Sequence, residues 1–119
     1  MSMRYTGLDG EATARDYLTG IGARIIDRNV KIGGGEIDII AMIDGVCAFI
    51  EVKRRTGTRY GRPSEAVTPS KMRKIIRAAS LYAAMHGLSD SPLRFDVIEL
   101  LPGEINHIPS AFDASDAGF

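Results

Sequence analysis

Residues 36–53 read EIDIIAMIDGVCAFIEVK, two apolar and β-branched runs separated by Asp44-Gly45. Asp-Gly between two such runs predicts a β-hairpin, because both positions tolerate a positive φ. With these two residues as the loop, Ile43 faces Val46, and every other cross-strand pair follows from that register. Only a loop of odd length or a bulge would change it. The stretch therefore predicts two antiparallel strands with defined partners.

In this register, charged residues gather at the open end of the hairpin. Asp38 lies opposite Glu51, and Glu36 lies opposite Lys53. Because side chains alternate between the faces of a strand, all four share one face that is otherwise apolar. Directly opposed residues have Cβ atoms about 5 Å apart, so the two facing carboxylates repel each other. The fold has to supply a cation or a proton there.

Two cations could neutralise Asp38 and Glu51. One is Lys53, two positions beyond Glu51. The other is a divalent cation, which binds oxygen ligands and takes only one or two protein carboxylates when phosphate and water complete its shell. The alternative is a salt-bridge cluster at the surface end of the hairpin, without chemistry. For each charge alone that alternative is preferred, but the combination of the three residues favours a metal site.

Length and composition indicate one globular domain. The chain has 119 residues, of which 45% are hydrophobic and 25% charged, which is enough for one core and too little for two. No apolar run approaches the length of a membrane span, and the N-terminal residues lack the apolar stretch of a signal peptide. We expect a cytoplasmic protein. The single cysteine, Cys47, falls on the predicted core face, so we expect it to be buried.

The formal net charge is zero, but the charges are unevenly distributed. Residues 53–77 carry basic side chains against Glu65 alone, and residues 90–119 carry acidic side chains against Arg94 alone. A basic block joined to an acidic block can present a positive surface to phosphates despite overall neutrality. The alternative is an ordinary solvated basic helix.

A helix and a strand are expected before the hairpin. Residues 8–20 predict a helix with Glu11 in its first turn, where the helix dipole favours a carboxylate. The side chains expected to form its buried stripe are Ala14, Tyr17, Leu18 and Ile21. Residues 23–30 predict a short strand, and the glycines at 33–35 predict a turn that leaves room for a ligand.

A loop and a helix are expected after the hairpin. Residues 54–68 form a loop rich in Arg and Gly, which suits phosphate contact but is equally at home on any surface. A helix then begins at Pro69, with Thr68 as its N-cap, and runs to about His86. Its basic residues concentrate in the N-terminal half, where they oppose the helix dipole. An anionic ligand would explain them, and Lys71 is the best placed.

Two further strands complete the prediction. Residues 93–101 form an apolar strand that should lie centrally in the sheet, with Asp96 paired to Arg94 or to a cation on a neighbouring strand. Residues 104–108 form a short edge strand, and residues 113–119 form a disordered tail. His86 and His107 have no partner at metal-ligand spacing, so we expect them to be structural or at the surface.

The order helix, strand, hairpin, helix, strand, with Asp38 followed 13 positions later by Glu51-Val52-Lys53, resembles the restriction-endonuclease-like superfamily, also called PD-(D/E)xK. The match departs from its name in one position, since Ile37 rather than Pro precedes Asp38. The chain more closely resembles the small YraN-like (UPF0102) proteins, predicted endonucleases similar to archaeal Holliday-junction resolvases. The segments that carry this resemblance are GEATARDYL at 10–18, GEIDIIA at 35–41, FIEVKRR at 49–55, Lys71, and RFDVIEL at 94–100.

The resemblance implies an α/β, single-domain restriction-endonuclease-like fold over residues 1–112, with a mixed central sheet flanked by helices. It also implies cleavage of nucleic acid, DNA in particular, with Mg²⁺ as cofactor and Mn²⁺ as a possible substitute. Asp38 and Glu51 would bind the metal, Lys53 would orient the attacking water, and Glu11 would be an accessory catalytic acid. The residues expected to contact nucleic acid are Lys71, Arg54, Arg55, Arg59 and Lys74.

Two other functions fit the sequence less well. A non-catalytic nucleic-acid-binding module would explain the net neutrality, but binding does not need Asp38, Glu51 and Lys53 together. A carboxylate-pair glycosidase would suit a separation of about 5 Å, yet the chain has no Trp for sugar stacking. With one active site per chain, cutting both strands of a duplex would require a homodimer or a protein partner. Nothing in the basic segment resembles a base-reading helix, so we expect recognition of nucleic-acid structure rather than sequence.

Overall fold

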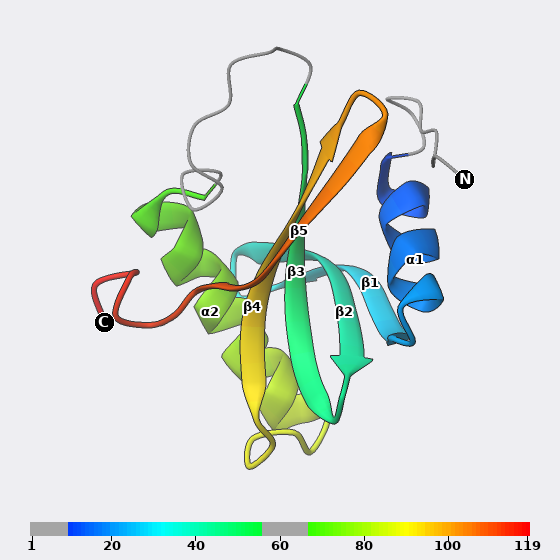
Figure 1. Cartoon of the computed structure of the whole chain (residues 1–119). Coiled ribbons are helices and arrows are strands. Elements are labelled where there is room, and N and C mark those ends of the chain that lie inside the picture. The colour runs from blue at the N-terminus through cyan, green and yellow to red at the C-terminus, as the bar shows by residue number, and fades with distance from the viewer. Residues whose placement is uncertain (1–9, 56–66) are drawn as a thin grey trace.

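The computed structural model describes residues 10–55 and 67–119, which form a five-stranded sheet with a helix on each face. Figure 1 shows these elements along the chain. They are α1 (Gly10–Gly20), β1 (Arg24–Ile32), β2 (Gly35–Ile43), β3 (Val46–Arg54), α2 (Pro69–Met85), β4 (Leu93–Leu101) and β5 (Glu104–Phe112). The strands lie in chain order, and all neighbours are antiparallel except β3 and β4, which are parallel. The predicted α/β fold with a mixed sheet is confirmed, and β4 lies inside the sheet as expected.

The central hairpin has the predicted register. Asp44 and Gly45 have φ angles of 50° and 79°, as a two-residue turn of this kind requires. The Cα partners run from Ile43 with Val46 to Ile39 with Ile50. Beyond that pair the two strands no longer match as backbone partners, which creates the opening described in the next section.

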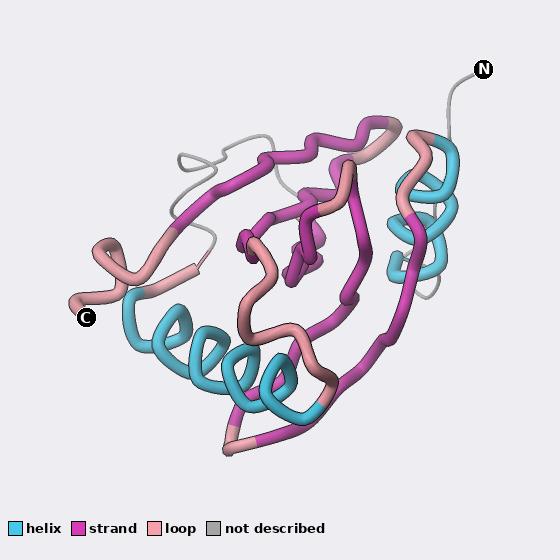
Figure 2. Tube along the Cα trace, turned by 90° about the horizontal axis from the view of Figure 1, so that it is seen from below, coloured by secondary structure: helices cyan, strands magenta, loops and turns pink. Residues whose placement is uncertain are grey.

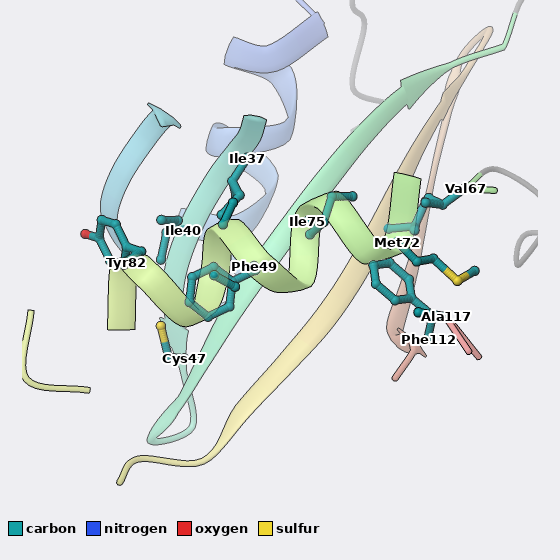
Figure 3. Close-up of a cluster of buried hydrophobic side chains, with 13 residues drawn as sticks. Ile37, Ile40, Cys47, Phe49, Val67, Met72, Ile75, Tyr82, Phe112 and Ala117 are labelled. Atoms are coloured by element: carbon teal, nitrogen blue, oxygen red, sulfur yellow. The ribbon is translucent and has the colours of Figure 1, made fainter. Parts of the chain in front are cut away.

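The two helices cover opposite faces of the sheet. Figure 2 shows the sheet curving around α2, with α1 on the outer side. On the α2 side, Ile75 and Tyr82 pack with Ile40 and Phe49 in one buried cluster (Figure 3), which also contains Cys47. On the α1 side, the helix contributes its small and apolar residues to a second cluster with the other faces of β2, β3 and β4. The predicted burial of Cys47 is confirmed.

The helix ends follow the expected signals with one exception. Thr68 caps α2, its side chain accepting a hydrogen bond from Lys71 N at 3.2 Å, and Pro69 is the first helical residue. The exception is Ile21, which was expected on the buried stripe of α1 but is 49% exposed. The helix ends at Gly20, and Gly22 turns the chain with a φ of 92°. The 3.6-residue period therefore stops before it reaches Ile21.

The strands are longer than the sequence suggested, and the sheet edges are irregular. β1 continues to Ile32 and β5 to Phe112, so the predicted ends at residues 30 and 108 were wrong. β1 shifts register against β2 near its start, and β5 shifts against β4 between Phe95 and Val97. Asn29 on β1 and Ser110 on β5 have positive φ angles of 52° and 50°. Such local changes of pairing cannot be read from a hydrophobic pattern.

The C-terminal residues 113–119 lie against α2 and make local hydrogen bonds. Asp113 N donates to Asp116 Oδ2 at 2.8 Å, and Asp116 N donates to Asp113 Oδ1 at 3.0 Å. Ala117 is fully buried against the α2 cluster, and its carbonyl accepts a hydrogen bond from Arg73 Nη1. The segment is held because its two aspartates close a turn and its alanine fills a space beside α2.

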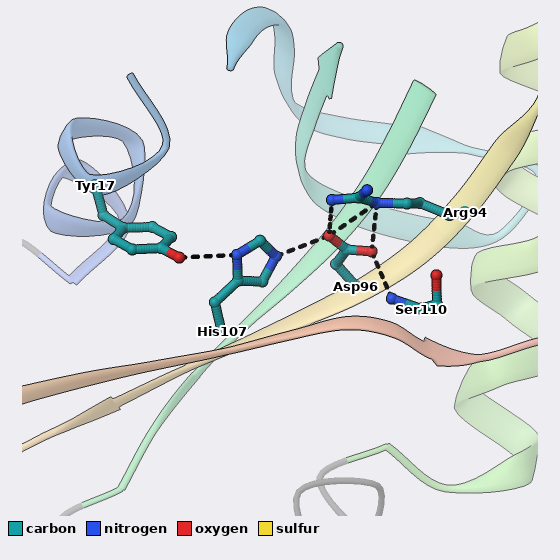
Figure 4. Close-up of polar contacts among 5 residues, drawn as sticks. All are labelled: Tyr17, Arg94, Asp96, His107 and Ser110. Carbon is teal, nitrogen blue, oxygen red and sulfur yellow. Dashed lines mark hydrogen bonds and ion pairs between the residues drawn. The ribbon is translucent and has the colours of Figure 1, made fainter. Parts of the chain in front are cut away.

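A buried polar network joins α1 to β4 and β5 (Figure 4). Asp96, completely buried, accepts hydrogen bonds from Arg94, from His107 Nε2 at 2.8 Å and from Ser110 N at 3.0 Å. His107 Nδ1 lies 3.0 Å from Tyr17 Oη. Burial opposes ionisation of Asp96, but the hydrogen bonds from His107, Ser110 and Arg94 outweigh it and hold the pKa of this carboxyl below its ordinary value. The predicted partner Arg94 is confirmed, and His107 is structural as expected.

Among the helices described, neither is long and apolar enough to cross a membrane.

Candidate functional site

The candidate site lies where β2 and β3 cease to pair. Asp38 is not a backbone partner of Glu51; instead, its Oδ2 accepts a hydrogen bond from Val52 N at 2.8 Å. If β2 and β3 continued to pair, a backbone carbonyl of β2 would accept this hydrogen bond; here the Asp38 carboxylate accepts it instead. This contact fixes the Asp38 side chain to the strand that carries Glu51 and Lys53, so the geometry of the hairpin determines how the three groups lie.

A pocket of about 130 Å³ opens at this point, between the hairpin and the N-terminal half of α2. Its lining residues are Gly34, Gly35, Glu36, Asp38, Glu51, Lys71, Lys74 and Ile75. The prediction that the carboxylates of β2 and β3 share one face is confirmed by this lining. The expected facing pair of Glu36 and Lys53 does not form, because the pairing of β2 with β3 ends at Ile39 and Ile50. On their other sides, Glu36 pairs with Lys31 of β1 and Lys53 with Glu99 of β4.

Gly35 allows α2 to approach the hairpin closely. A Cβ at this position would lie 2.6 Å from the carbonyl oxygen of Lys74 and 3.2 Å from Ala78 Cβ. Any other residue would therefore push the helix away from β2. The sequence suggested that these glycines leave room for a ligand, whereas Gly35 instead leaves room for the helix that carries the basic side chains.

Glu51 holds two ammonium groups on a single oxygen atom. Its Oε1 lies 2.6 Å from Lys71 Nζ and 3.5 Å from Lys53 Nζ. The Glu51 side chain is only 7% exposed, whereas Lys71 is 41% and Lys53 30% exposed. The neighbouring Lys71 and partial burial lower the pKa of Lys53, although Glu51 opposes them. For Lys71 burial acts downward, but Glu51 outweighs it and raises the pKa above its ordinary value.

The environment of Asp38 disfavours its charge. Burial, followed by the nearby charge of Glu51, raises the pKa of Asp38 to about 6, against the opposing hydrogen bond from Val52 N. Both nearby lysines form their ion pairs with Glu51, and Asp38 has no ion pair among the described residues. Two carboxylates that face one open pocket, one of them without an ion pair among the described residues, are a suitable donor set for a divalent cation.

The donor set consists of two carboxylates rather than three. Among the residues in 10–55 and 67–119, no three His, Cys, Asp or Glu side chains come close enough together to hold one ion. Glu36 lines the pocket but is exposed to solvent. Because Mg²⁺ commonly takes one or two carboxylates and completes its shell with water and phosphate, Asp38 and Glu51 fit such an ion without a third acid.

Glu11 reaches the same end of the sheet from α1. Its charge contributes to the raised pKa of Asp38, although it does not line the pocket. With the Asn29 amide oriented so that its nitrogen faces Glu11, it donates to the two carboxylate oxygens at 2.8 and 3.1 Å. The structure thus places Glu11 near the predicted pair, which spacing along the sequence alone could not do.

The predicted nucleic-acid contacts fall into four groups. Lys71 and Lys74 line the pocket. Arg54 is exposed, and its stem lies beside Gly10 at the start of α1. Arg55 instead forms an ion pair with Glu99, its Nε 3.2 Å from Oε2, so it is held in a structural contact. Arg59 lies outside the described residues.

Sequence reasoning did not identify two groups that shape the site, Val52 N–H and Asn29. A backbone donor has no sequence signal, since any residue but proline supplies it. Asn29 carries a weak signal, because Asn is one of the few residues that tolerate the positive φ found there.

Comparison with known proteins gives one consistent result. The sequence model of the uncharacterised protein family UPF0102 matches residues 10–100 of this chain. A UPF0102 protein of Symbiobacterium thermophilum is 53% identical over 100 residues, covering 84% of this chain and 85% of that protein. A UPF0102 protein of Chlorobaculum parvum is 46% identical over 127 residues, covering 97% of each, and one of Clostridioides difficile is 44% identical over 114 residues, covering 94% of this chain and all of the relative. The chain therefore belongs to the UPF0102 family of YraN-like proteins.

Proposed function

We propose that this protein is a metal-dependent endonuclease that hydrolyses phosphodiester bonds of nucleic acid, with DNA as the preferred substrate. The observation that supports it most is the open pocket lined by Asp38, Glu51 and Lys71, with Lys53 in contact with Glu51. The carboxylates of Asp38 and Glu51 suit a divalent cation. The ammonium groups of Lys53 and Lys71 beside them suit a phosphate. This combination exceeds what nucleic-acid binding alone requires.

In this proposal, Asp38 and Glu51 hold Mg²⁺, or Mn²⁺ in its place. The ion, when bound, supplies positive charge that polarises a phosphoryl oxygen and activates water. Val52 N–H keeps the Asp38 carboxylate aimed at the pocket. Glu11 adds negative charge from the α1 side, as an accessory acid.

Lys53 is proposed to orient the attacking water and to stabilise the negative charge that develops on the phosphate. Its ammonium lies 3.5 Å from Glu51 Oε1, next to one proposed metal ligand. Among the described residues it forms no ion pair with Asp38, the other proposed ligand. Lys71 and Lys74, at the N-terminal half of α2, supply the phosphate contacts. None of these groups reads bases, which favours recognition of the shape of the nucleic acid.

A second function is supported by the ion pairs of Glu51. Because Glu51 already contacts two lysines, the cluster could be structural, and the protein a nucleic-acid-binding module without catalysis. The raised pKa of Asp38 counts against this reading, since a purely structural cluster gains nothing from a carboxylate that resists ionisation.

Cleavage of a panel of labelled DNA distinguishes the two functions. The purified protein is incubated with Mg²⁺ or Mn²⁺ and with linear, nicked, flapped and four-way substrates, alongside Asp38→Asn. Asp90→Asn, an exposed carboxylate in the turn after α2, is the matched control. Metal-dependent cleavage that Asp38→Asn abolishes and Asp90→Asn retains supports the nuclease. Intact DNA in every lane, with a gel shift, supports the binding module.

The role of Lys53 is tested by Lys53→Met. We expect cleavage to fall by about 10²-fold or more, because one group that stabilises transition-state charge is removed. Binding of Mn²⁺, measured by calorimetry, should persist, because Asp38 and Glu51 remain. Cleavage at the wild-type rate would remove Lys53 from the mechanism.

A further inference from the structure

Lys71 occupies a position that a divalent cation would need. Its Nζ lies 2.6 Å from Glu51 Oε1, closer than the 3.5 Å of Lys53. Glu51 is nearly buried, so the lysine supplies positive charge where water reaches poorly. In the absence of metal, this ion pair makes a buried carboxylate tolerable.

We propose that Lys71 is an exchangeable counter-ion, which neutralises Glu51 while the metal site is empty and transfers to a phosphate of the nucleic acid when a divalent cation binds. This inference rests on the proposed function and adds the order in which positive charges occupy the pocket. Asp38, on the other side of the pocket, makes no ion pair among the described residues, so Glu51 is where lysine and metal compete.

The solvent exposure of Lys71 favours exchange. Its side chain is 41% exposed and extends from the first turn of α2, so its ammonium can leave Glu51 for solvent without disturbing the core. Lys53 extends from the same strand and face as Glu51 and is less exposed. A divalent ion between Asp38 and Glu51 repels both ammonium groups, and the one that can move is Lys71.

The freed ammonium remains close to other positive charge. Lys74 lies one helical turn further along α2, lines the same pocket and makes no ion pair among the described residues. Lys71 beside Lys74 gives two cations on one helix face, at the end of α2 that carries the positive pole of its dipole. A phosphate entering the pocket would be held by both lysines only after metal has displaced Lys71.

Metal binding to the free protein tests the exchange. Calorimetric titration of Mn²⁺ into wild type, Lys71→Met and Lys74→Met is done without nucleic acid. Removing the competing ammonium should tighten Mn²⁺ binding by about fivefold or more, a typical size for a coupling between two sites. Lys74→Met removes the same charge from the same pocket but no ion pair, so its effect should be much smaller. Lys71→Gln, with a polar side chain, should behave as Lys71→Met if both fold.

The outcomes separate the inference from the proposed function. Mn²⁺ affinity in Lys71→Met that equals the wild-type value, or falls below it, overturns the exchange and leaves the metal site standing. Absence of Mn²⁺ binding in all variants, each shown to be folded by circular dichroism, overturns the proposed metal site and the exchange with it.

Nucleic-acid binding gives an independent readout. A labelled DNA duplex is titrated in EDTA and then in Ca²⁺, which occupies oxygen sites. Relative to wild type, Lys71→Met should lose more DNA affinity in Ca²⁺ than in EDTA, because in EDTA Glu51 holds the Lys71 ammonium and keeps it from a phosphate. Lys74→Met should bind more weakly in both. A loss in Lys71→Met that is equal in EDTA and in Ca²⁺ contradicts the exchange.

Discussion

Asp38 shows how a single carboxylate can be positioned precisely and yet resist ionisation. The hydrogen bond from Val52 N fixes its direction, while burial and Glu51 raise its pKa to about 6. A side chain that is fixed by the fold but unfavourable in its charged form is typical of functional sites. Its cost to the metal-free protein can be measured.

Asp38→Asn should stabilise the metal-free fold at neutral pH. Because the folded pKa is raised, the wild type loses stability as pH rises from about 4, the ordinary pKa, to about 6. The Asn amide oxygen can still accept the hydrogen bond from Val52 N and carries no charge. We expect a gain of about 2 kcal/mol above pH 6 and none below pH 4, measured by urea unfolding in EDTA from pH 4 to 8. Asp90→Asn is the control, and an equal gain at every pH would refute the assignment.

The sequence predicted the positions of single site residues where the register of the hairpin determines those positions. Asp38, Glu51 and Lys53 came from one turn and the two-residue period of strands; in the structure Asp38 and Glu51 line one pocket, and Lys53 contacts Glu51. The contact between Lys71 and Glu51 could not be predicted in the same way, because it depends on how α2 crosses the sheet. Lys71 was singled out by its unfavourable position in the helix dipole and by the family resemblance, neither of which names Glu51 as its partner.

At the scale of elements, the approach of α2 to β2 assembles the site. The β2–β3 hairpin presents the carboxylates and the helix presents Lys71 and Lys74, so the spacing between hairpin and helix sets the size of the pocket. Gly35 permits this spacing, because a Cβ there would meet the backbone of α2. The sequence predicted the hairpin and the helix from periodicity and capping, but the distance between them comes from packing.

Gly35→Ala should therefore loosen the helix from the sheet. A Cβ at 2.6 Å from the Lys74 carbonyl forces a backbone shift, and overpacking of this kind costs about 1–3 kcal/mol. Thermal unfolding measures the loss, and Mn²⁺ binding should weaken in parallel. Gly20→Ala is the matched control, since nothing lies within 4 Å of its added Cβ. Equal effects of the two substitutions would show that the close approach does not matter.

Across the whole molecule, the network of Tyr17, His107 and Asp96 ties α1 to β4 and β5. Because Asp96 can only accept, His107 Nε2 donates to it, and a neutral His107 then accepts at Nδ1 from the Tyr17 hydroxyl. This chain of contacts helps to hold α1, and with it Glu11, in place. The sequence suggested the pair of Asp96 with Arg94, but contacts between residues 17 and 107 have no local signal.

Asp96→Asn should be among the most destabilising polar substitutions. Removing one member of a buried charged pair costs about 3 kcal/mol or more, here because Arg94 is left without its carboxylate. The folded pKa of Asp96 is lowered, so its contribution is complete above its ordinary pKa and is lost as pH falls through the folded value. The difference between wild type and Asp96→Asn in the free energy of unfolding, measured with urea, should shrink in acid.

Tyr17→Phe is the matched control, because it removes only one hydrogen bond of the network. It should cost about 1 kcal/mol at neutral pH. An effect of Asp96→Asn as small as this would contradict the network's importance.

The edges of the sheet have a consequence for assembly. β1 presents the exposed side chains of Arg24, Arg28 and Lys31, and β5 contains Pro109, which lacks a backbone donor, followed by Ser110 with its left-handed φ. Charged, kinked and proline-containing edges discourage a further strand from adding to a sheet. Two copies that cut opposite strands of a duplex would then not be joined edge to edge. Their spacing would be set by the nucleic acid between them or by a helical face, so cleavage of paired strands should depend on the geometry of the substrate.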